Sequence, residues 1–284
     1  MPDPRIPQTN FNPPFNITRA SHLVFTVRDL ATSRAFYTEV MGLIVSDEDA
    51  NTLWLRGVEE RAHHSLTLKK TSGQPQCERV GFRVFMDEDL DKAKAYFDRA
   101  DIKAAFVDTP HQDRTLHFND PAGTPVELVA TMKTVPRMHT RIDTHRGAGA
   151  LRMDHYQVLV PDVLATAKFY MELGFRISDY LYVEAAQRVV GTFLHRKDNP
   201  WDIVLLARSG PRFHHGAATW SKPSRTSCGP VTSPATLALP TASSTAPAAT
   251  ATSIRIISIC AIRTAIAPNC CCPGFRSSTS TTSR

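Results

Sequence analysis

The chain has 284 residues, enough for one large domain or two ordinary ones with a buried core. Its net charge of +6 does not indicate a nucleic-acid partner, because the excess comes from six basic residues scattered through the last 68 positions, which contain no acidic residue. The first 216 residues contain a single cysteine, Cys77, which excludes a disulfide framework there. Since neither a leader peptide nor a run of about 18 apolar residues is visible, we expect a cytoplasmic protein that binds no nucleic acid and no membrane.

The first structural module is predicted for residues 17–68. Alternating apolar residues predict a strand over 17–28, and Asp29 is a plausible N-cap for a helix over 31–41 that ends at Gly42. Three further strands are expected at 43–46, 52–55 and 65–68. The order of elements is therefore βαβββ.

A second module of the same order follows. Residues 80–85 predict a strand, and the next segment predicts a helix whose apolar face carries Leu90, Ala93, Phe97 and Ala100. Strands are expected at 104–107, 115–118 and 125–130. We expect the two modules to form an N-terminal domain over 17–132, after an extension over 1–16.

One segment of the first module recurs in the second half of the chain. Residues 22–42 return as 155–174, with a one-residue gap before the final glycine. At a constant offset of 133 the identical pairs are His22/His155, Val27/Val160, Asp29/Asp162, Phe36/Phe169, Tyr37/Tyr170 and Glu39/Glu172. A repeat of this kind indicates a duplicated unit, each copy opening with a histidine-bearing strand.

The second half therefore predicts another pair of modules. After a polar connector over 133–150, a third module runs from Leu151 to about Leu206, and a fourth opens at Phe213. We expect an α+β fold of tandem βαβββ modules in two domains, with the second domain, over 151–216, incomplete.

The composition changes sharply near residue 216. Asp202 is the last acidic residue, and Ser and Thr make up 24 of the last 68 positions. One interpretation is a low-complexity, disordered segment. The interpretation we favour is that 217–284 is read out of frame, because a one-base shift over 259–272 permits an Asp-Pro-Asp-x-His-Arg motif, then Glu at the Pro268–Asn269 junction, then three leucines. A truncated fourth module would leave one face of the third uncovered, exposing either Val158 and Leu205 with Leu206 or their neighbours on the opposite face, and would make the protein poorly soluble.

The repeated histidine strands suggest a metal site. Alternate side chains of a strand share a face, so His155 and Gln157 lie together, and His215 shares a face with Phe213, opposite His214. Two imidazoles from the opening strands of paired modules can converge on one ion of iron, zinc, nickel or copper.

An ordered set of motifs carries a family resemblance. It consists of Asp154-His155 with Pro161-Asp162, then His195-Arg196-Lys197 with Trp201-Asp202-Ile203, then Gly210-Pro211-Arg212-Phe213-His214-His215. The chain resembles the vicinal oxygen chelate superfamily over about residues 17–216, and within it the extradiol ring-cleavage dioxygenases of aromatic catabolism, the catechol and homoprotocatechuate 2,3-dioxygenases. The resemblance implies Fe(II), or Mn(II) in some members, held by two His and one Glu, with a catechol and O2 as substrates and frequent homo-oligomers.

The resemblance also assigns roles to residues. His155 and His215 match the two histidine ligands, and Gln157 and Phe193 match positions that line the substrate pocket. Trp201 stands where homoprotocatechuate enzymes have an acid/base histidine; an indole cannot shuttle a proton, which leaves His195 as a weak candidate. The glutamate ligand has no counterpart in the translated sequence, so activity of this chain is in doubt.

Two other functions stay open. A binding protein for aromatic compounds that keeps the fold without catalysis is favoured if residues 217–284 are authentic, and a glyoxalase-type lyase or isomerase would use a different metal. In the first module pair, His22 and Glu127 occupy the places of two ligands and Val80 that of the third, which we interpret as a relic. The remaining histidines have no matching partners and are expected to be surface or structural residues: His63, His64, His111, His117, His139 and His145.

Overall fold

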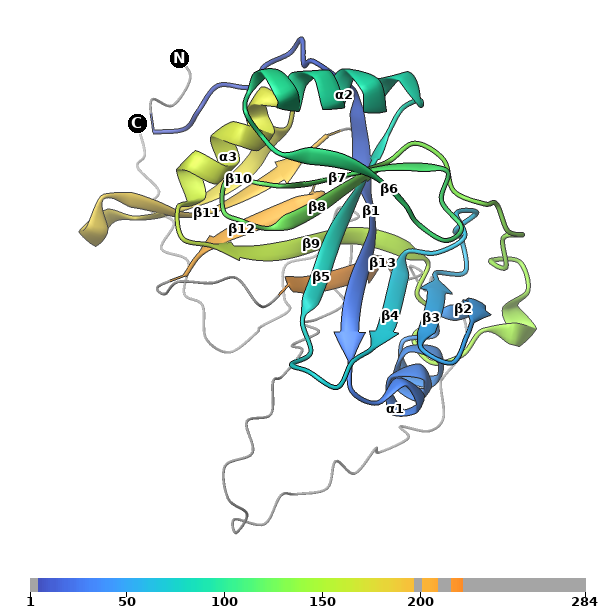
Figure 1. Cartoon of the computed structure of the whole chain (residues 1–284). Helices are drawn as coiled ribbons and strands as arrows, with labels where there is room; N and C mark the ends of the chain where they lie inside the picture. The colour runs from blue at the N-terminus through green and yellow to red at the C-terminus, as the bar shows by residue number, and fades with distance from the viewer. Residues whose placement is uncertain (1–4, 197–200, 209–215, 222–284) are drawn as a thin grey trace.

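A computed structural model describes residues 5–196, 201–208 and 216–221, the last six as backbone only. Its strands form two sheets (Figure 1). The strand order is β2-β3-β4-β1-β5-β8-β7-β6 in the first and β10-β11-β12-β9-β13 in the second. Each complete module repeats one arrangement, in which the first and last of its four strands pair in parallel. The α+β fold of tandem βαβββ modules is therefore confirmed.

The first module follows the predicted order, with one difference in its helix. Asp29 caps the helix as predicted, since its carboxylate accepts a hydrogen bond from the backbone N–H of Thr32 at 3.0 Å. The helix changes to a wider π-helical turn after Ala35, and Gly42 follows with a φ of +76°. The elements are β1 (Ile17–Val27), α1 (Leu30–Ala35), η1 (Phe36–Val40), β2 (Ile44–Glu48), β3 (Thr52–Arg56) and β4 (Leu66–Lys70).

The second module buries the predicted helix face, except at its last position. Leu90, Ala93 and Phe97 are buried, but Ala100 is exposed because the helix ends at Arg99 and Ala100 is only its C-cap. The elements are β5 (Cys77–Val84), α2 (Glu88–Arg99), β6 (Ala104–Asp108), β7 (Arg114–Asn119) and β8 (Pro125–Val129).

The third module is complete, and one strand of the fourth is described. Asp162 caps α3 just as Asp29 caps α1. The elements are η2 (Ile142–Thr144) in the connector, β9 (Arg152–Val160), α3 (Val163–Glu172), β10 (Arg176–Val183), η3 (Glu184–Ala186), β11 (Arg188–His195), β12 (Ile203–Ala207) and β13 (Gly216–Ser221). Strand β13 pairs antiparallel with β9, as β5 does with β1. Residues 217–221, expected to lie out of frame, thus form most of a strand; 222–284 lie outside the described residues.

One hydrophobic core joins the two sheets. The ring of Phe82 in the first domain lies 5.4 Å from Tyr156, 5.8 Å from Tyr170 and 5.3 Å from Phe175 of the second, measured between centroids. Val158 and Leu205 are fully buried, so of the two faces expected to lack a cover, this one is covered. The first domain covers that face of the third module, whereas the opposite face of β9 is only partly buried.

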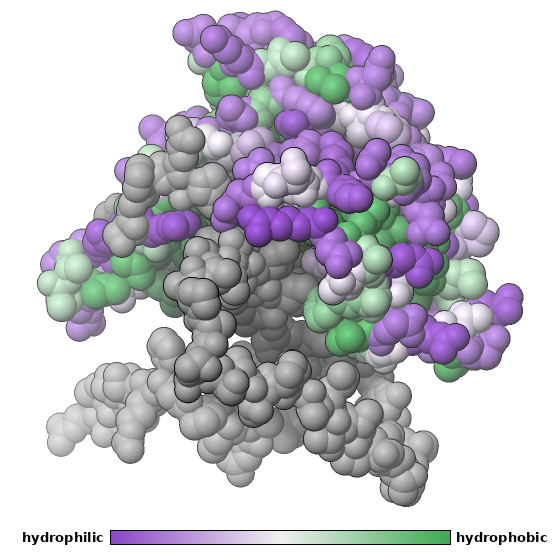
Figure 2. Space-filling view, turned by 60° about the horizontal axis from the view of Figure 1, so that its bottom comes forward, coloured by the Kyte–Doolittle hydropathy of each residue, from purple (hydrophilic) through white to green (hydrophobic). Residues whose placement is uncertain are grey.

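The described surface is largely hydrophilic in the view of Figure 2, with scattered apolar patches. Exposed apolar side chains include Phe11, Phe85 and Ile142, which come from separate parts of the chain. Among the described helices, none is long and apolar enough to cross a membrane.

Candidate functional site

His155 lies on β9 with its ring orientation set by a neighbouring carboxylate. Its Nδ1 is 2.7 Å from Oδ2 of Asp154, and both side chains are mostly buried. An ionised carboxylate only accepts, so this contact favours the tautomer that carries its proton on Nδ1. The lone pair then lies on Nε2, the arrangement in which a histidine binds a metal while its other nitrogen donates to an outer carboxylate.

Trp201 packs against His155, and Phe193 packs against Trp201. The Trp201 ring meets the imidazole edge-on, with centroids 5.2 Å apart and an interplanar angle of 88°. Phe193 on β11 lies 5.2 Å from Trp201. The indole N–H of Trp201 points to Oδ2 of Asp179 at 3.4 Å. These contacts place three of the sequence-predicted site residues, His155, Trp201 and Phe193, in one contiguous cluster.

The sheet register relates the other predicted residues to this cluster. Phe193 pairs with Val204, Val204 with Gln157, and Gln157 with Ala217 on β13, so Phe193 and Gln157 lie in one row across the sheet. His195 is two residues beyond Phe193 on the same face of β11. His215 lies outside the described residues, which resume with Gly216 opposite Val158.

Asp202, the residue that follows Trp201, contacts the first domain through its side chain. Its buried carboxylate accepts hydrogen bonds from the backbone N–H of Ala20 at 2.8 Å and of Arg196 at 2.7 Å. Burial raises the pKa of Asp202 to about 6, although both hydrogen bonds oppose the rise. The position of Trp201 therefore depends on contacts between the two domains.

Comparison with known proteins identifies the family. The model of the Glyoxalase/Bleomycin resistance protein/Dioxygenase superfamily matches residues 19–128 and 152–251. The chain belongs to this superfamily. The second match extends beyond residue 216, where the composition changes.

Several of the similar solved structures are dioxygenases. The structure resembles a variant of homoprotocatechuate 2,3-dioxygenase from B. fuscum, with a TM-score of 0.69 and 32% identity over 76% of this chain and 61% of that one. The anaerobic complex of that enzyme with 3,4-dihydroxyphenylacetate, from Brevibacterium fuscum, gives 0.68 and 33% over 74% and 66%. Metapyrocatechase from Geobacillus stearothermophilus is 22% identical over 221 residues, 72% of this chain and 67% of its own. The chain thus spans less than two thirds of the length of either dioxygenase structure.

In this superfamily member, the first module pair holds a histidine and a glutamate in direct contact. Nε2 of the fully buried His22 lies 2.5 Å from Oε1 of Glu127. Gly81, opposite His22 on β5, makes room for this contact, because a Cβ at that position would overlap the imidazole ring. The two side chains therefore share a direct contact in the core, and Val80 is buried among apolar residues.

Further polar groups surround Glu127. Nε2 of Gln112 donates to Oε1 at 2.9 Å, Nε2 of His117 lies 3.1 Å from Oε2, and Arg79 lies 3.6 Å from Oε2. Burial raises the pKa of Glu127, but the neighbouring His22 and the hydrogen bonds outweigh that effect and hold the pKa well below its usual range. The carboxylate therefore stays ionised in the core.

Several histidines that match no ligand position in the repeat make contacts inside the protein. His117 contacts Glu127, and His63 and His64 are buried, with their Nδ1 atoms 3.2 Å apart. His111 stacks on His63 with centroids 3.8 Å apart. Apart from the adjacent His63 and His64, these residues come from separate strands and turns, so no local spacing indicates their contacts. His139 is exposed, as expected.

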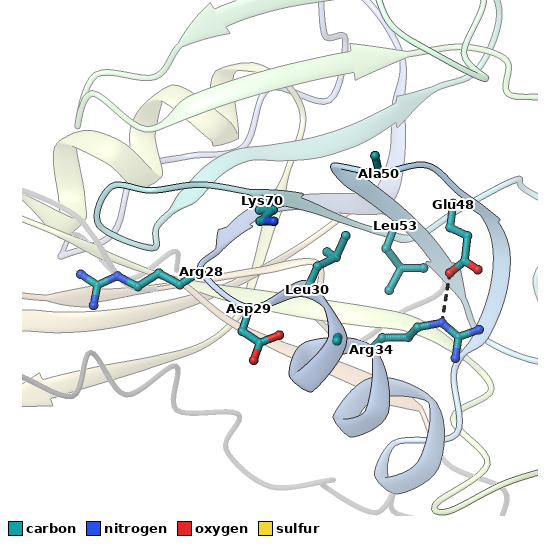
Figure 3. Close-up of a pocket in the computed structure, with 9 residues that line it drawn as sticks. Arg28, Asp29, Leu30, Arg34, Glu48, Ala50, Leu53 and Lys70 are labelled. Carbon is teal, nitrogen blue, oxygen red and sulfur yellow. Dashed lines mark hydrogen bonds and ion pairs between the residues drawn. The ribbon is translucent and has the colours of Figure 1, made fainter.

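A surface pocket beside α1 lies apart from both histidine clusters (Figure 3). Its charged groups serve local structure, since Asp29 caps the helix and Nε of Arg34 pairs with Glu48 at 3.0 Å. We assign no function to it.

Proposed function

We propose that the chain is a metal-dependent extradiol dioxygenase that opens a catecholic ring with O2, acting on catechol or on a compound of the 3,4-dihydroxyphenylacetate type. The observation that carries this proposal is the cluster of His155, Phe193 and Trp201, in which Asp154 leaves Nε2 of His155 as the metal-binding atom. The similarity to the two named dioxygenases supports the reaction class.

His155 and His215 are the proposed metal ligands, with Fe(II) as the ion and Mn(II) as the alternative. The imidazole of His155 suits these ions, because its other nitrogen faces a carboxylate. The ion would supply coordination positions at which a catecholate and O2 meet. No glutamate follows Asp202 in the sequence, so we expect the ion to be held more weakly than by a complete set of ligands.

The remaining residues have roles in binding and proton transfer. Phe193 and Trp201 would form an aromatic wall against the ring of the substrate, and Gln157, in the same cross-strand row, would hydrogen-bond to a ring substituent. Trp201 can donate through its indole but cannot accept a proton. His195 is the proposed group for moving a proton, because it lies on the same strand face as Phe193.

We also propose the domain organisation expected from the sequence. Residues 1–16 would be an extension, 17–132 the N-terminal domain, 133–150 a connector and 151–216 the start of the catalytic domain, in a homo-oligomer. Residues 217–284 would be out of frame, and sequencing the encoding DNA tests this directly.

Activity is tested with anaerobically iron-loaded protein mixed with catechol or 3,4-dihydroxyphenylacetate and then exposed to air. We expect yellow ring-fission product from a frame-corrected protein and little or none from the present chain. In the corrected protein, His155→Ala should abolish turnover, whereas the exposed His139→Ala should not change it. Turnover of a methylglyoxal–glutathione adduct instead would assign a glyoxalase-type reaction.

A binding protein is the second candidate, favoured by the missing acidic residue after Asp202. Calorimetric titration of the present chain with catechol separates the two functions. Binding without turnover, in both the present and the frame-corrected protein, would establish the binding function and refute the dioxygenase.

A further inference from the structure

Three potential metal ligands from distant parts of the first sheet lie close together. Asp47 is on the edge strand β2, His63 is between β3 and β4, and His111 is in the turn between β6 and β7, at the opposite edge. One ligand atom from each lies within 4.8 Å of the others. We propose that Asp47, His63 and His111 form a zinc-binding site, separate from the site around His155.

The donor set suits a borderline divalent cation. Two imidazoles and one carboxylate are common ligands of Zn²⁺, with a water molecule completing a tetrahedron. Donor atoms at about 2.1 Å from a tetrahedral ion are about 3.4 Å apart, so the present spread needs only a modest closure. Nε2 of His111 and Oδ2 of Asp47 are already 3.4 Å apart.

His63 is the ligand whose ring is already held in place. Its side chain is fully buried. The contact between its Nδ1 and Nδ1 of His64 at 3.2 Å orients the ring from behind.

His111 is the ligand that must move. Its ring stacks on His63 with an interplanar angle of 9°, and parallel rings do not aim their lone pairs at one point. Binding an ion requires the His111 ring to tilt out of this stack. The residue has a φ of +66°, a conformation that is strained for a residue with a side chain and is held by its surroundings.

The charges around the site predict moderate affinity. The half-exposed Asp47 provides a negative charge and a route from solvent. Arg56 and Lys133 lie near enough to lower the pKa of His63, and they would also oppose a cation. A bound ion would connect β2 to the β6–β7 turn and so stabilise the first domain.

The test uses the full chain in a background that removes other metal ligands. His155→Ala removes the proposed catalytic site, and serine replaces the five cysteines after residue 216, which would otherwise bind zinc as thiolates. Equilibrium dialysis against Zn²⁺ should give one ion per chain, and Co²⁺ should give visible bands without a thiolate charge-transfer band.

Two variants remove ligands with little disturbance to the fold. His111→Gly suits the positive φ and should abolish stoichiometric binding; Asp47→Asn, at an exposed position, should weaken it at least tenfold. The control His139→Ala should bind as the background does. Zinc should raise the melting temperature of the background by roughly 5 °C but not that of His111→Gly. Absence of binding in the background, or unchanged binding in both variants, would overturn the proposal without affecting the dioxygenase assignment.

Discussion

Replacing Gly81 with alanine should strongly destabilise the protein, because the new methyl group would occupy the space of the His22 ring. The ring cannot move aside easily, since it is fully buried and held 2.5 Å from Glu127. Overpacking costs about 1–3 kcal/mol, and weakening the hydrogen bond of the buried, ionised Glu127 carboxylate costs about 1–3 kcal/mol. We therefore expect the free energy of unfolding to fall by about 3–5 kcal/mol, within the range that the two costs give together.

Urea denaturation followed by tryptophan fluorescence measures this loss. The control is Gly73→Ala, where the added Cβ meets only Thr71 Oγ1 at 3.4 Å, and which should change stability by less than about 0.5 kcal/mol. The double variant Gly81→Ala/His22→Ala should be no less stable than His22→Ala alone, because the methyl group then fills vacated space. A Gly81→Ala protein as stable as its parent, or additive effects in the double variant, would refute the reasoning.

Three further predictions concern buried polar groups. Glu127→Gln should lower the free energy of unfolding by about 3 kcal/mol at pH 7. Because the folded-state pKa of Glu127 is depressed, the difference in stability between variant and parent should narrow as the pH falls below about 4.5. Urea titrations measure this difference, and a value that does not change with pH would contradict the prediction. Asp202 has a folded-state pKa raised to about 6, so the folded protein binds a proton more tightly than the unfolded chain. The free energy of unfolding should therefore fall by roughly 3 kcal/mol as the pH rises from about 4 to 6. Asp202→Asn should flatten this part of the profile of stability against pH, and an unchanged slope would show that Asp202 is not the group responsible. Tyr170→Phe removes the hydroxyl that donates to Asp120 at 3.0 Å and should lower stability by about 1–2 kcal/mol by calorimetry, with no loss arguing against that bond.

Much of the fold could be predicted from the sequence because it depends on local patterns. Asp29 and Asp162 cap helices that follow equivalent strands, as their spacing indicated. The alternation along β9 separates buried Tyr156 and Val158 from partly buried His155 and Gln157. The error at Ala100 is also local, because the helix ends one residue before it.

The contacts of the candidate site could be predicted less well from the sequence. The order of the motifs identified His155, Phe193 and Trp201 as candidate site residues. The edge-on packing of the indole, however, depends on where Asp202 meets Ala20 of the other domain. The roles of these three candidate residues and of His195, Gln157 and His215 stay predictions.

The sequence by itself determined the repeated βαβββ order and the histidine at the start of each repeat, because periodicity and caps act over a few residues. Only the tertiary structure decided that Glu127 on β8 meets His22 on β1, and that Asp47 on β2 meets His111 in the turn between β6 and β7. The first contact depends on the strand order, which places β5 between β1 and β8, and on the space that Gly81 provides on β5. Neither is encoded in the spacing of the residues that make contact.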